Sequence, residues 1–271
     1  MPLRARRRRV RVGIVFCVLV VLALIGYGIH YVSYLPQFSI QSVTVVGAQQ
    51  VSPRLVSEYA QTILDDGSYH FLSRKNILLY PGVAIERAIA NYFPRIASAS
   101  VSRPDFSSTD LVVTVTERQL FALWCASPDT CYQMDNGGFI FASASSTSAT
   151  STEYIFHGGI ATSTSPIGQT FVSAHLPALT ALLTELGQAG FTPDGASVDN
   201  DTDFSVPLQS GYLIKGSFGE NADTLVKNLQ LVLGSDALQG NTDQLEYVDL
   251  RFGDRVYYKL KGEAEATSTP Q

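Results

Sequence analysis

The side chains that could ligate a metal or take part in catalysis are scattered along this chain. Its four histidines stand at positions 30, 70, 157 and 175, and no H-E-x-x-H motif pairs any of them for zinc. No G-x-S-x-G elbow, no G-x-x-x-x-G-K-[ST] phosphate loop and no Ser-x-x-Lys box is present. We therefore expect no catalytic residue, no metal site and no cofactor.

Two groups of charged residues invite a functional reading. Asp199, Asp201 and Asp203 alternate in a loop, as calcium ligands do, but the glycine and the bidentate glutamate of an EF-hand are missing, which favours a solvated acidic turn. Glu117 and Arg118 stand together at the end of a predicted strand. Their place at a domain junction favours an orienting salt bridge or a binding role over catalysis.

The charge distribution of the chain argues against nucleic acid as a partner. The net charge is −5, although six arginines lie in the first eleven residues, so the rest of the chain is more acidic still. Binding to phosphates needs clustered lysine and arginine, which an acidic body does not offer.

The amino terminus carries a membrane signal. Residues 12–29 are almost wholly aliphatic, and 18 residues span about 27 Å, close to the roughly 30 Å of a bilayer's hydrocarbon core. Tyr27, Tyr31 and Tyr34 supply an interfacial aromatic belt, and the arginines predict a cytoplasmic amino terminus.

The alternative is a cleaved signal peptide, for which residues 26–28 offer a weak cleavage site. We expect an uncleaved single-pass anchor over residues 12–35, a cytoplasmic basic tail over 1–11, and an extracytoplasmic remainder.

Two of the three cysteines are placed to form a disulfide. Cys125 and Cys131 flank a turn-forming stretch between two apolar runs, so on opposed strands of a hairpin their Cα atoms could come within bridging distance. An oxidising exterior permits the bond, and two reduced thiols are the alternative. Cys17 lies inside the anchor, and no second Cys or His pair at zinc-ligand spacing accompanies the other two.

The exterior part divides into two regions. Residues 38–117 predict the order β-α-α-β-β, with strands from 38 to Gly47, 96–103 and 111–117 and helices at 52–64 and 81–92. The apolar residues expected to face inward are Leu55, Val56, Tyr59, Ala60 and Ile63 in the first helix and Val83, Ile85, Ala88 and Ile89 in the second.

Residues 118–261 predict a β-rich domain with two packing helices. Strands are expected at 121–124, 131–134, 139–141, 212–218, 245–250 and 255–261. Ser173 and Asn221 are expected to cap the helices, whose inward residues are Leu176, Leu179, Leu182, Leu183 and Leu186 and then Leu225, Val226, Leu229 and Val232.

Two polar segments are expected to lack regular structure. Residues 142–152 contain only Ala, Ser and Thr, which predicts a mobile loop, with a modified stalk as the alternative. The tail 262–271 is predicted to be disordered.

Five motifs in this order resemble the bacterial cell-division family FtsQ/DivIB. They are SIQSVTVVG at 39–47, FPRIASASV at 93–101, VTVTER at 113–118, DNGGFIF at 135–141 and YVDLRF at 247–252. The last is the most specific, because it is similar to the family's C-terminal V-D-L-R-[YF] signature. The Ala/Ser/Thr insert and the cysteine pair depart from the family pattern.

The resemblance implies an α+β bitopic membrane protein with a POTRA domain at 38–117 and a β domain at 118–261. It implies a non-enzymatic scaffold in the cell membrane, enriched at the septum, which binds FtsB/FtsL-type division proteins and takes no small-molecule substrate. The alternative is a POTRA-containing protein of export or outer-membrane assembly. That class is disfavoured because no nucleophile is arranged and no strand series is long enough for a membrane barrel.

The last predicted strand is the candidate partner site. Residues 255–261 are followed by a polar tail, so their outer edge lacks an obvious cover. Lys259 and Lys261 would protect such an edge in one interpretation, and a partner would add a strand to it in the other. The resemblance implies that FtsB binds after the V-D-L-R signature. The expected contact residues are Arg251 as a charge anchor, Phe252 as an apolar contact, and Val256, Tyr257, Tyr258 and Leu260.

Overall fold

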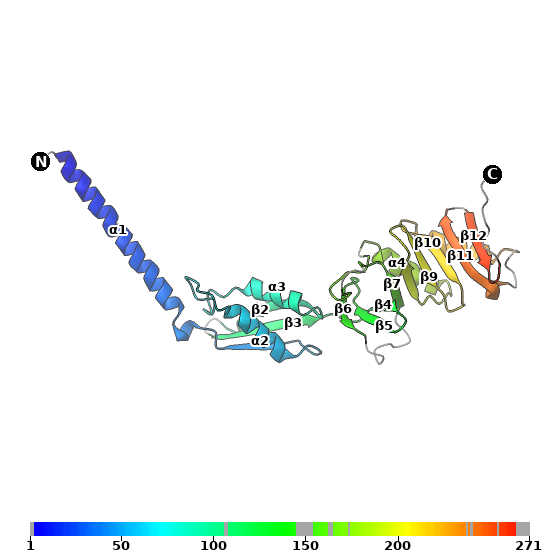
Figure 1. Ribbon diagram of the computed structural model, residues 1–271, viewed down its shortest axis with the longest axis horizontal. Coiled ribbons are helices and arrows are strands. Elements are labelled where there is room, and N and C mark those ends of the chain that lie inside the picture. Colours follow the sequence, from blue (N-terminus) through cyan, green and yellow to red (C-terminus); the bar gives the residue numbers. More distant parts are fainter. Residues whose placement is uncertain are drawn as a thin grey trace. The chain divides into compact units, whose positions relative to one another are not determined.

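A computed structural model describes residues 3–105, 108–144, 154–161, 165–172, 174–236, 238, 241–253 and 255–263 (Figure 1). The chain separates into two compact units, Met1–Glu117 and Arg118–Gln271. Most of the Ala/Ser/Thr insert and the tail from residue 264 lie outside the described residues. Ser173 also lies outside them, and its predicted role as a helix cap is wrong, because the helix that follows begins at Leu176 with His175 at its N-cap position.

The first unit begins with one long helix, α1 (Leu3–Ser33), which Figure 1 shows without interruption. Arginine has a high helix propensity, so the basic segment continues the apolar helix instead of ending it. Within α1, Arg11–Ser33 is long and apolar enough to cross a membrane. A signal sequence near an amino terminus has the same length and composition. Its large apolar side chains are exposed, as Leu24 is at 66%.

The first unit then forms a three-stranded sheet with two helices, and the predicted β-α-α-β-β order is confirmed. A short helical turn, η1 (Pro36–Phe38), leads into β1 (Ser42–Val46), α2 (Pro53–Leu64), α3 (Gly82–Tyr92), β2 (Ile96–Ser102) and β3 (Asp110–Glu117). The strand order is β1-β3-β2, with β1 parallel and β2 antiparallel to β3.

Two residues predicted to face the core of this unit are exposed. Leu55 is 55% exposed because Val56, Ala60 and Leu64 form the buried line of α2 at four-residue spacing. Val83 is 59% exposed because Ile85 and Ile89 set the buried face of α3, and a position two residues away points elsewhere. The helices pack on Leu111, Val113 and Val115 of β3.

The backbone after β1 adopts a conformation that requires glycine at position 47. The φ of Gly47 is +90°, and a Cβ atom there would lie 2.2 Å from the carbonyl oxygen of Val115. A glycine therefore permits both the left-handed turn after β1 and the close approach to β3.

The second unit is a mixed sheet of nine described strands in the order β12-β11-β10-β9-β8-β7-β4-β5-β6. The pairs β4–β7, β7–β8 and β10–β11 are parallel and the other neighbours are antiparallel. The strands are β4 (Ala122–Ser127), β5 (Thr130–Met134), β6 (Ile140–Ser143), β7 (Tyr154–Gly158), β8 (Gly195–Val198), β9 (Asp203–Pro207), β10 (Leu213–Ser217), β11 (Leu245–Phe252) and β12 (Arg255–Leu260).

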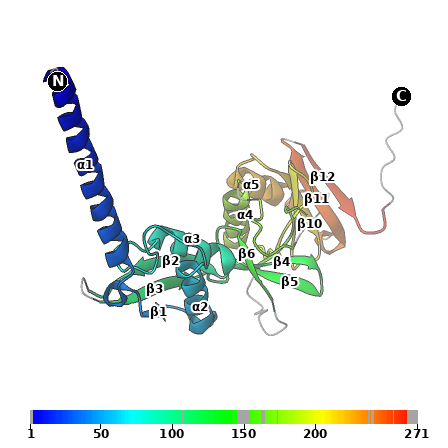
Figure 2. The same cartoon turned by 60° about the vertical axis from the view of Figure 1, so that its left-hand side comes forward.

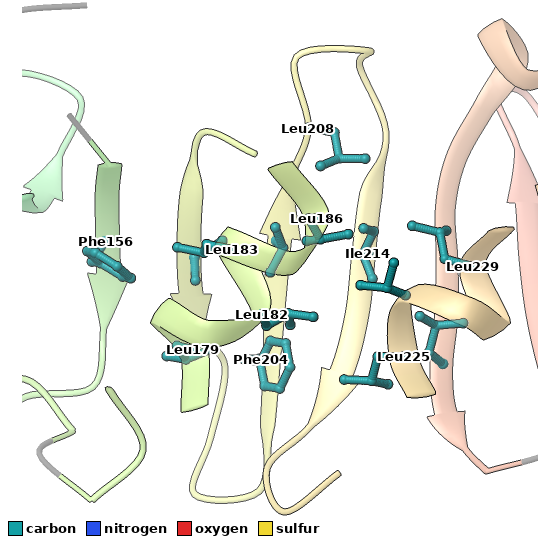
Figure 3. Close-up of a cluster of buried hydrophobic side chains, with 14 of the residues drawn as sticks. Phe156, Leu179, Leu182, Leu183, Leu186, Phe204, Leu208, Ile214, Leu225 and Leu229 are labelled. Atoms are coloured by element: carbon teal, nitrogen blue, oxygen red, sulfur yellow. The ribbon is translucent and has the colours of Figure 1, made fainter. Parts of the chain in front are cut away.

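Two helices, α4 (Leu176–Gln188) and α5 (Ala222–Leu233), pack together against this sheet (Figure 2), and a helical turn, η2 (Thr242–Gln244), precedes β11. The predicted leucines of α4 are all buried, and Figure 3 shows four of them beside Phe204 and Ile214. The cap of α5 is confirmed, because the Asn221 side chain accepts a hydrogen bond from the N–H of Asp223 over 2.9 Å.

Candidate partner-binding edge

Strand β12 is the last strand of the nine-stranded sheet. Among the described strands, β11 is its one neighbour, and the two run antiparallel with Val248 opposite Tyr258 and Asp249 opposite Tyr257. An edge strand pairs on one side, so N–H and C=O groups on its other side point away from the sheet.

The opposite edge of the same sheet is covered by the chain itself. In β6, the N–H of Ile140 donates to the carbonyl of Gln169 over 2.9 Å, and the N–H of Gly168 donates back to Ile140 over 2.8 Å. The backbone N–H and C=O groups of Ile140 are thereby both hydrogen-bonded on the side away from β5. The described part of the chain thus covers the β6 edge with residues 168–170 and places no strand on the β12 edge.

The side chains of β12 divide between the two faces of the sheet. Val256 and Leu260 are half-buried and pack on the core under the helices. Tyr257 and Tyr258 are 50% and 39% exposed. Phe252, at the end of β11, is 55% exposed and meets Tyr257 edge to face, with ring centroids 5.2 Å apart.

We name Phe252, Tyr257 and Tyr258 the edge aromatics. Tyr257 and Tyr258 are successive strand residues, so they point to opposite faces. The structure therefore brings Tyr257, and not Tyr258, to Phe252. A strand bound at this edge would meet an aromatic side chain on each face.

Arg251 was expected to anchor a partner, but its guanidinium contacts two carboxylates of this chain. Nε and Nη2 donate to both oxygens of Asp249 over 2.9 and 2.6 Å, and Nη1 donates to Asp203 over 2.9 Å. Hydrogen bonding to Asp249 raises the pKa of Arg251, with Asp203 adding to it against the effect of burial. Arg251 therefore links strand β11 to strand β9 within the chain.

Asp203, the last aspartate of the acidic run 199–203, is the second carboxylate that Arg251 contacts. Ser217 and then Arg251, by their hydrogen bonds, lower the pKa of Asp203, while Asp199 accepts a hydrogen bond from Ser205 over 2.6 Å. Asp203 and Asp249 are the residues whose role sequence reasoning missed. Asp249 and Arg251 are two apart in a strand and so share one face, which was the available signal.

The two lysines expected to protect the edge both contact acceptors within the chain. Lys259 lies 3.0 Å from the carboxylate of Glu246, and its side chain is 17% exposed. The Lys261 ammonium donates to the carbonyl of Asp243 over 3.2 Å. The charge of Lys259 is therefore compensated by a carboxylate of β11, whereas Lys261 contacts a backbone carbonyl of η2.

Glu117 and Arg118, expected at a domain junction, bind separately, each within its own unit. The Glu117 carboxylate accepts hydrogen bonds from the N–H groups of Gln49, Gln50 and Val51 at 2.8–3.1 Å. Burial works to raise the pKa of Glu117, but these three donors outweigh it and the pKa is lowered.

Arg118 forms an ion pair with Asp135, and its guanidinium lies 3.9 Å from the ring centre of Phe139. Asp135 also accepts the N–H groups of Gly137 and Phe139 at 2.9 Å each, which closes the turn between β5 and β6. Arg118 therefore fixes the start of the second unit to the β5–β6 turn.

Cys125 and Cys131 form a disulfide across the β4–β5 hairpin, where they stand directly opposite with Cα atoms 4.0 Å apart. The histidines remain dispersed: His157 lies 2.9 Å from the carbonyl of Cys125, and His175 stacks on Phe218 at 4.2 Å. In the part of the chain that the structure describes, no three His, Cys, Asp or Glu side chains form a group that could hold a metal ion.

Comparison of the sequence with models of known protein families and with curated proteins gives no match.

Proposed function

We propose that this chain is a non-enzymatic, single-pass membrane scaffold that binds another membrane protein by strand addition at β12. The observation that carries the proposal is the contrast between the two edges of one sheet: β6 is covered by residues 168–170, whereas β12 carries exposed aromatic side chains and no described strand beyond it, with Glu263 bonding the backbone of Leu260 at its last residue. Backbone pairing supplies affinity in this mode, and the side chains beside the edge supply selectivity.

The chemistry of the edge describes the partner. The partner presents an extended segment with apolar or aromatic residues at neighbouring positions, because Tyr257 and Tyr258 stand on opposite faces of the edge and each face of the added strand meets one of them. Tyrosine offers a large contact area with a polar tip at little entropic cost, which suits an interface.

The sequence motifs support a more specific proposal, in which the chain is a division protein of the FtsQ/DivIB type. Its amino terminus would lie in the cytoplasm and the residues after the anchor outside it, with the protein concentrated at the septum and bound to FtsB/FtsL-type partners. The exposed apolar surface of Arg11–Ser33 supports the membrane placement.

Site-specific photocrosslinking in living cells tests the partner site. A photoreactive phenylalanine analogue at Tyr258 should capture a membrane protein, whereas the same analogue at Leu231, which is 74% exposed on α5, should capture none. Capture at Ala99 of β2 in place of Tyr258 would move the site to the edge of the three-stranded sheet.

Depletion of the protein tests the biological role. A division scaffold yields filaments or chains of cells, whereas an export component yields mislocalised envelope proteins. A reporter fused at Gln271 should be active outside the cytoplasm, and the chain should keep its amino terminus. A mature chain that starts near Ile29 would contradict the anchor.

A further inference from the structure

The first unit contains an apolar groove of about 430 Å³ where the end of α1 meets the loop before α3. Its large apolar lining side chains are Ile25, Ile29 and Val32 of the helix and Phe38, Leu78 and Leu79 outside it. Leu78 and Leu79 are 58% and 47% exposed, an unusual condition for two successive leucines in a loop.

Buried hydrogen bonds fix this loop to the helix. The Asn76 amide donates to the carbonyl of Ser33 over 3.1 Å, and the Ser33 hydroxyl accepts the N–H of Ser73 over 3.2 Å. All three residues are at most 7% exposed. These hydrogen bonds therefore fix the position of the loop along the axis of α1.

At this position the loop lies beside the apolar segment of α1. Arg11–Ser33 has 23 residues, which at 1.5 Å each gives about 34 Å, more than the roughly 30 Å of a hydrocarbon core. Ile25 and Ile29 lie in its last turns and face the groove. If α1 spans the bilayer, Leu78 and Leu79 stand beside helix residues that contact acyl chains.

The backbone of the loop meets the requirement of a lipid environment. Four successive N–H groups have acceptors within the unit: Asn76 donates to Ser73, Ile77 to Phe38 over 2.8 Å, and Leu78 and Leu79 to the side chain and carbonyl of Asn76 at 3.0 and 2.9 Å. Hydrocarbon offers no partner to a free N–H group, so this self-satisfaction is what insertion demands.

Aromatic residues surround the same end of α1. The His30 ring lies 2.6 Å from the carbonyl of Phe71, and the Tyr34 hydroxyl donates to the carbonyl of His70 over 2.6 Å. Tyr69 and Phe71 are 78% and 59% exposed beside them. Such a cluster is typical of the level of lipid headgroups.

We propose that loop 76–79 inserts into the outer leaflet of the membrane and that the groove holds a lipid acyl chain. This inference rests on the proposed membrane-spanning role of α1. The occupant is lipid because the groove wall continues the lipid-facing surface of the helix. The loop would thereby fix the first unit against the membrane surface at a defined height.

Fluorescence quenching in nanodiscs tests the insertion. The full-length chain, with Cys17→Ala, carries bimane on Leu78→Cys and is reconstituted in phosphatidylcholine and phosphatidylglycerol with nitroxide-labelled acyl chains. The probe should lose most of its fluorescence, and Leu79→Cys should behave likewise. Leu55→Cys, an equally exposed leucine on the first turn of α2, should keep its fluorescence.

A probe at Leu22→Cys, which is 58% exposed on α1, separates the two hypotheses. Quenching at Leu22→Cys without quenching at Leu78→Cys overturns the inserted loop and leaves the span intact. Absence of quenching at Leu22→Cys overturns the span and the loop together.

Discussion

The guanidinium of Arg251 on β11 reaches Asp203 on β9, with Nη1 and Oδ2 2.9 Å apart although 48 positions separate the two residues. Strand β10 lies between those two strands, so the contact crosses the sheet. Asp249 receives the other side of the same guanidinium and is 5% exposed.

We expect Arg251→Ala to destabilise the second unit by about 2 kcal/mol, because it leaves the buried Asp249 without a counter-ion. Arg251→Lys keeps the positive charge and should recover a part of this stability. The recovery should be incomplete, because an ammonium cannot bind two carboxylates as the planar guanidinium does. Trp124, the single tryptophan of the chain and 5% exposed, reports unfolding of this unit in urea. Unchanged stability with lost partner binding would restore Arg251 to a role as charge anchor.

A double substitution at the edge aromatics should separate binding from stability. We expect Phe252→Ala with Tyr258→Ala to weaken partner binding by about 2 kcal/mol or more, the magnitude of an interface hot spot. Both side chains are exposed, so the thermal midpoint of the chain should change little. Titration calorimetry against the captured partner measures the first effect, and Leu231→Ala is the matched control.

Binding at full strength by that double variant would place the site elsewhere. Tyr257→Ala is the informative third variant, because Tyr257 is the side chain that supports Phe252 edge to face. A loss from Tyr257→Ala alone would assign the interface to one face of β12.

The elements most visible in the sequence were those with a strong period or a cap. The five leucines of α4 and the Asn221 cap of α5 follow helical spacing and local hydrogen bonding, and both predictions are confirmed. No bounds were predicted for strands β7, β8 and β9, because they have four or five residues and the last two include Gly195 and Pro207, which interrupt a strand pattern.

The candidate site was predictable in part. The place of β12 at the edge of the described sheet agrees with the prediction, but the role of Arg251 depends on Asp203, a residue distant in sequence. No local pattern encodes a contact across an intervening strand. The exposed side of α2 was misjudged at Leu55 for a related reason, since the apolar residues leave two possible stripes and tertiary packing selects one.

The hairpin disulfide should stabilise the second unit. Replacing both Cys125 and Cys131 by alanine should cost about 2 kcal/mol, as expected for a short closed loop. Reductant should lower the urea midpoint of the original chain and leave that of the double variant unchanged, and Cys17→Ala should have no effect. Mass spectrometry of protein from the native envelope should find the linked peptides, and free thiols at both positions would refute the bond.

Gly47 offers a test of backbone strain with an internal control. Gly47 and Gly67 both have positive φ, at +90° and +72°, but a Cβ at Gly67 meets nothing within 4 Å. We expect Gly67→Ala to cost about 1 kcal/mol from the left-handed conformation alone. Gly47→Ala should cost about 3 kcal/mol or more, because β1 must also move away from Val115. Equal losses, measured by urea unfolding of the full-length chain, would contradict the close approach.

The last prediction concerns acid and the loop that Glu117 holds. The pKa of Glu117 is lowered, so its hydrogen bonds to Gln49, Gln50 and Val51 stabilise the first unit fully above the ordinary value of 4.5 and are lost as the pH falls through the lowered one. Hydrogen exchange of a peptide covering residues 47–56 should therefore accelerate on acidification beyond its intrinsic pH dependence, by about 1–2 kcal/mol of lost protection. Glu117→Gln should lack this step and show low protection at neutral pH already. Glu58→Gln removes an exposed helix-surface pair with Arg54 and should leave the step in place, because such pairs contribute little. An identical acid response in the original chain and in Glu117→Gln would show that the three N–H groups do not depend on this carboxylate.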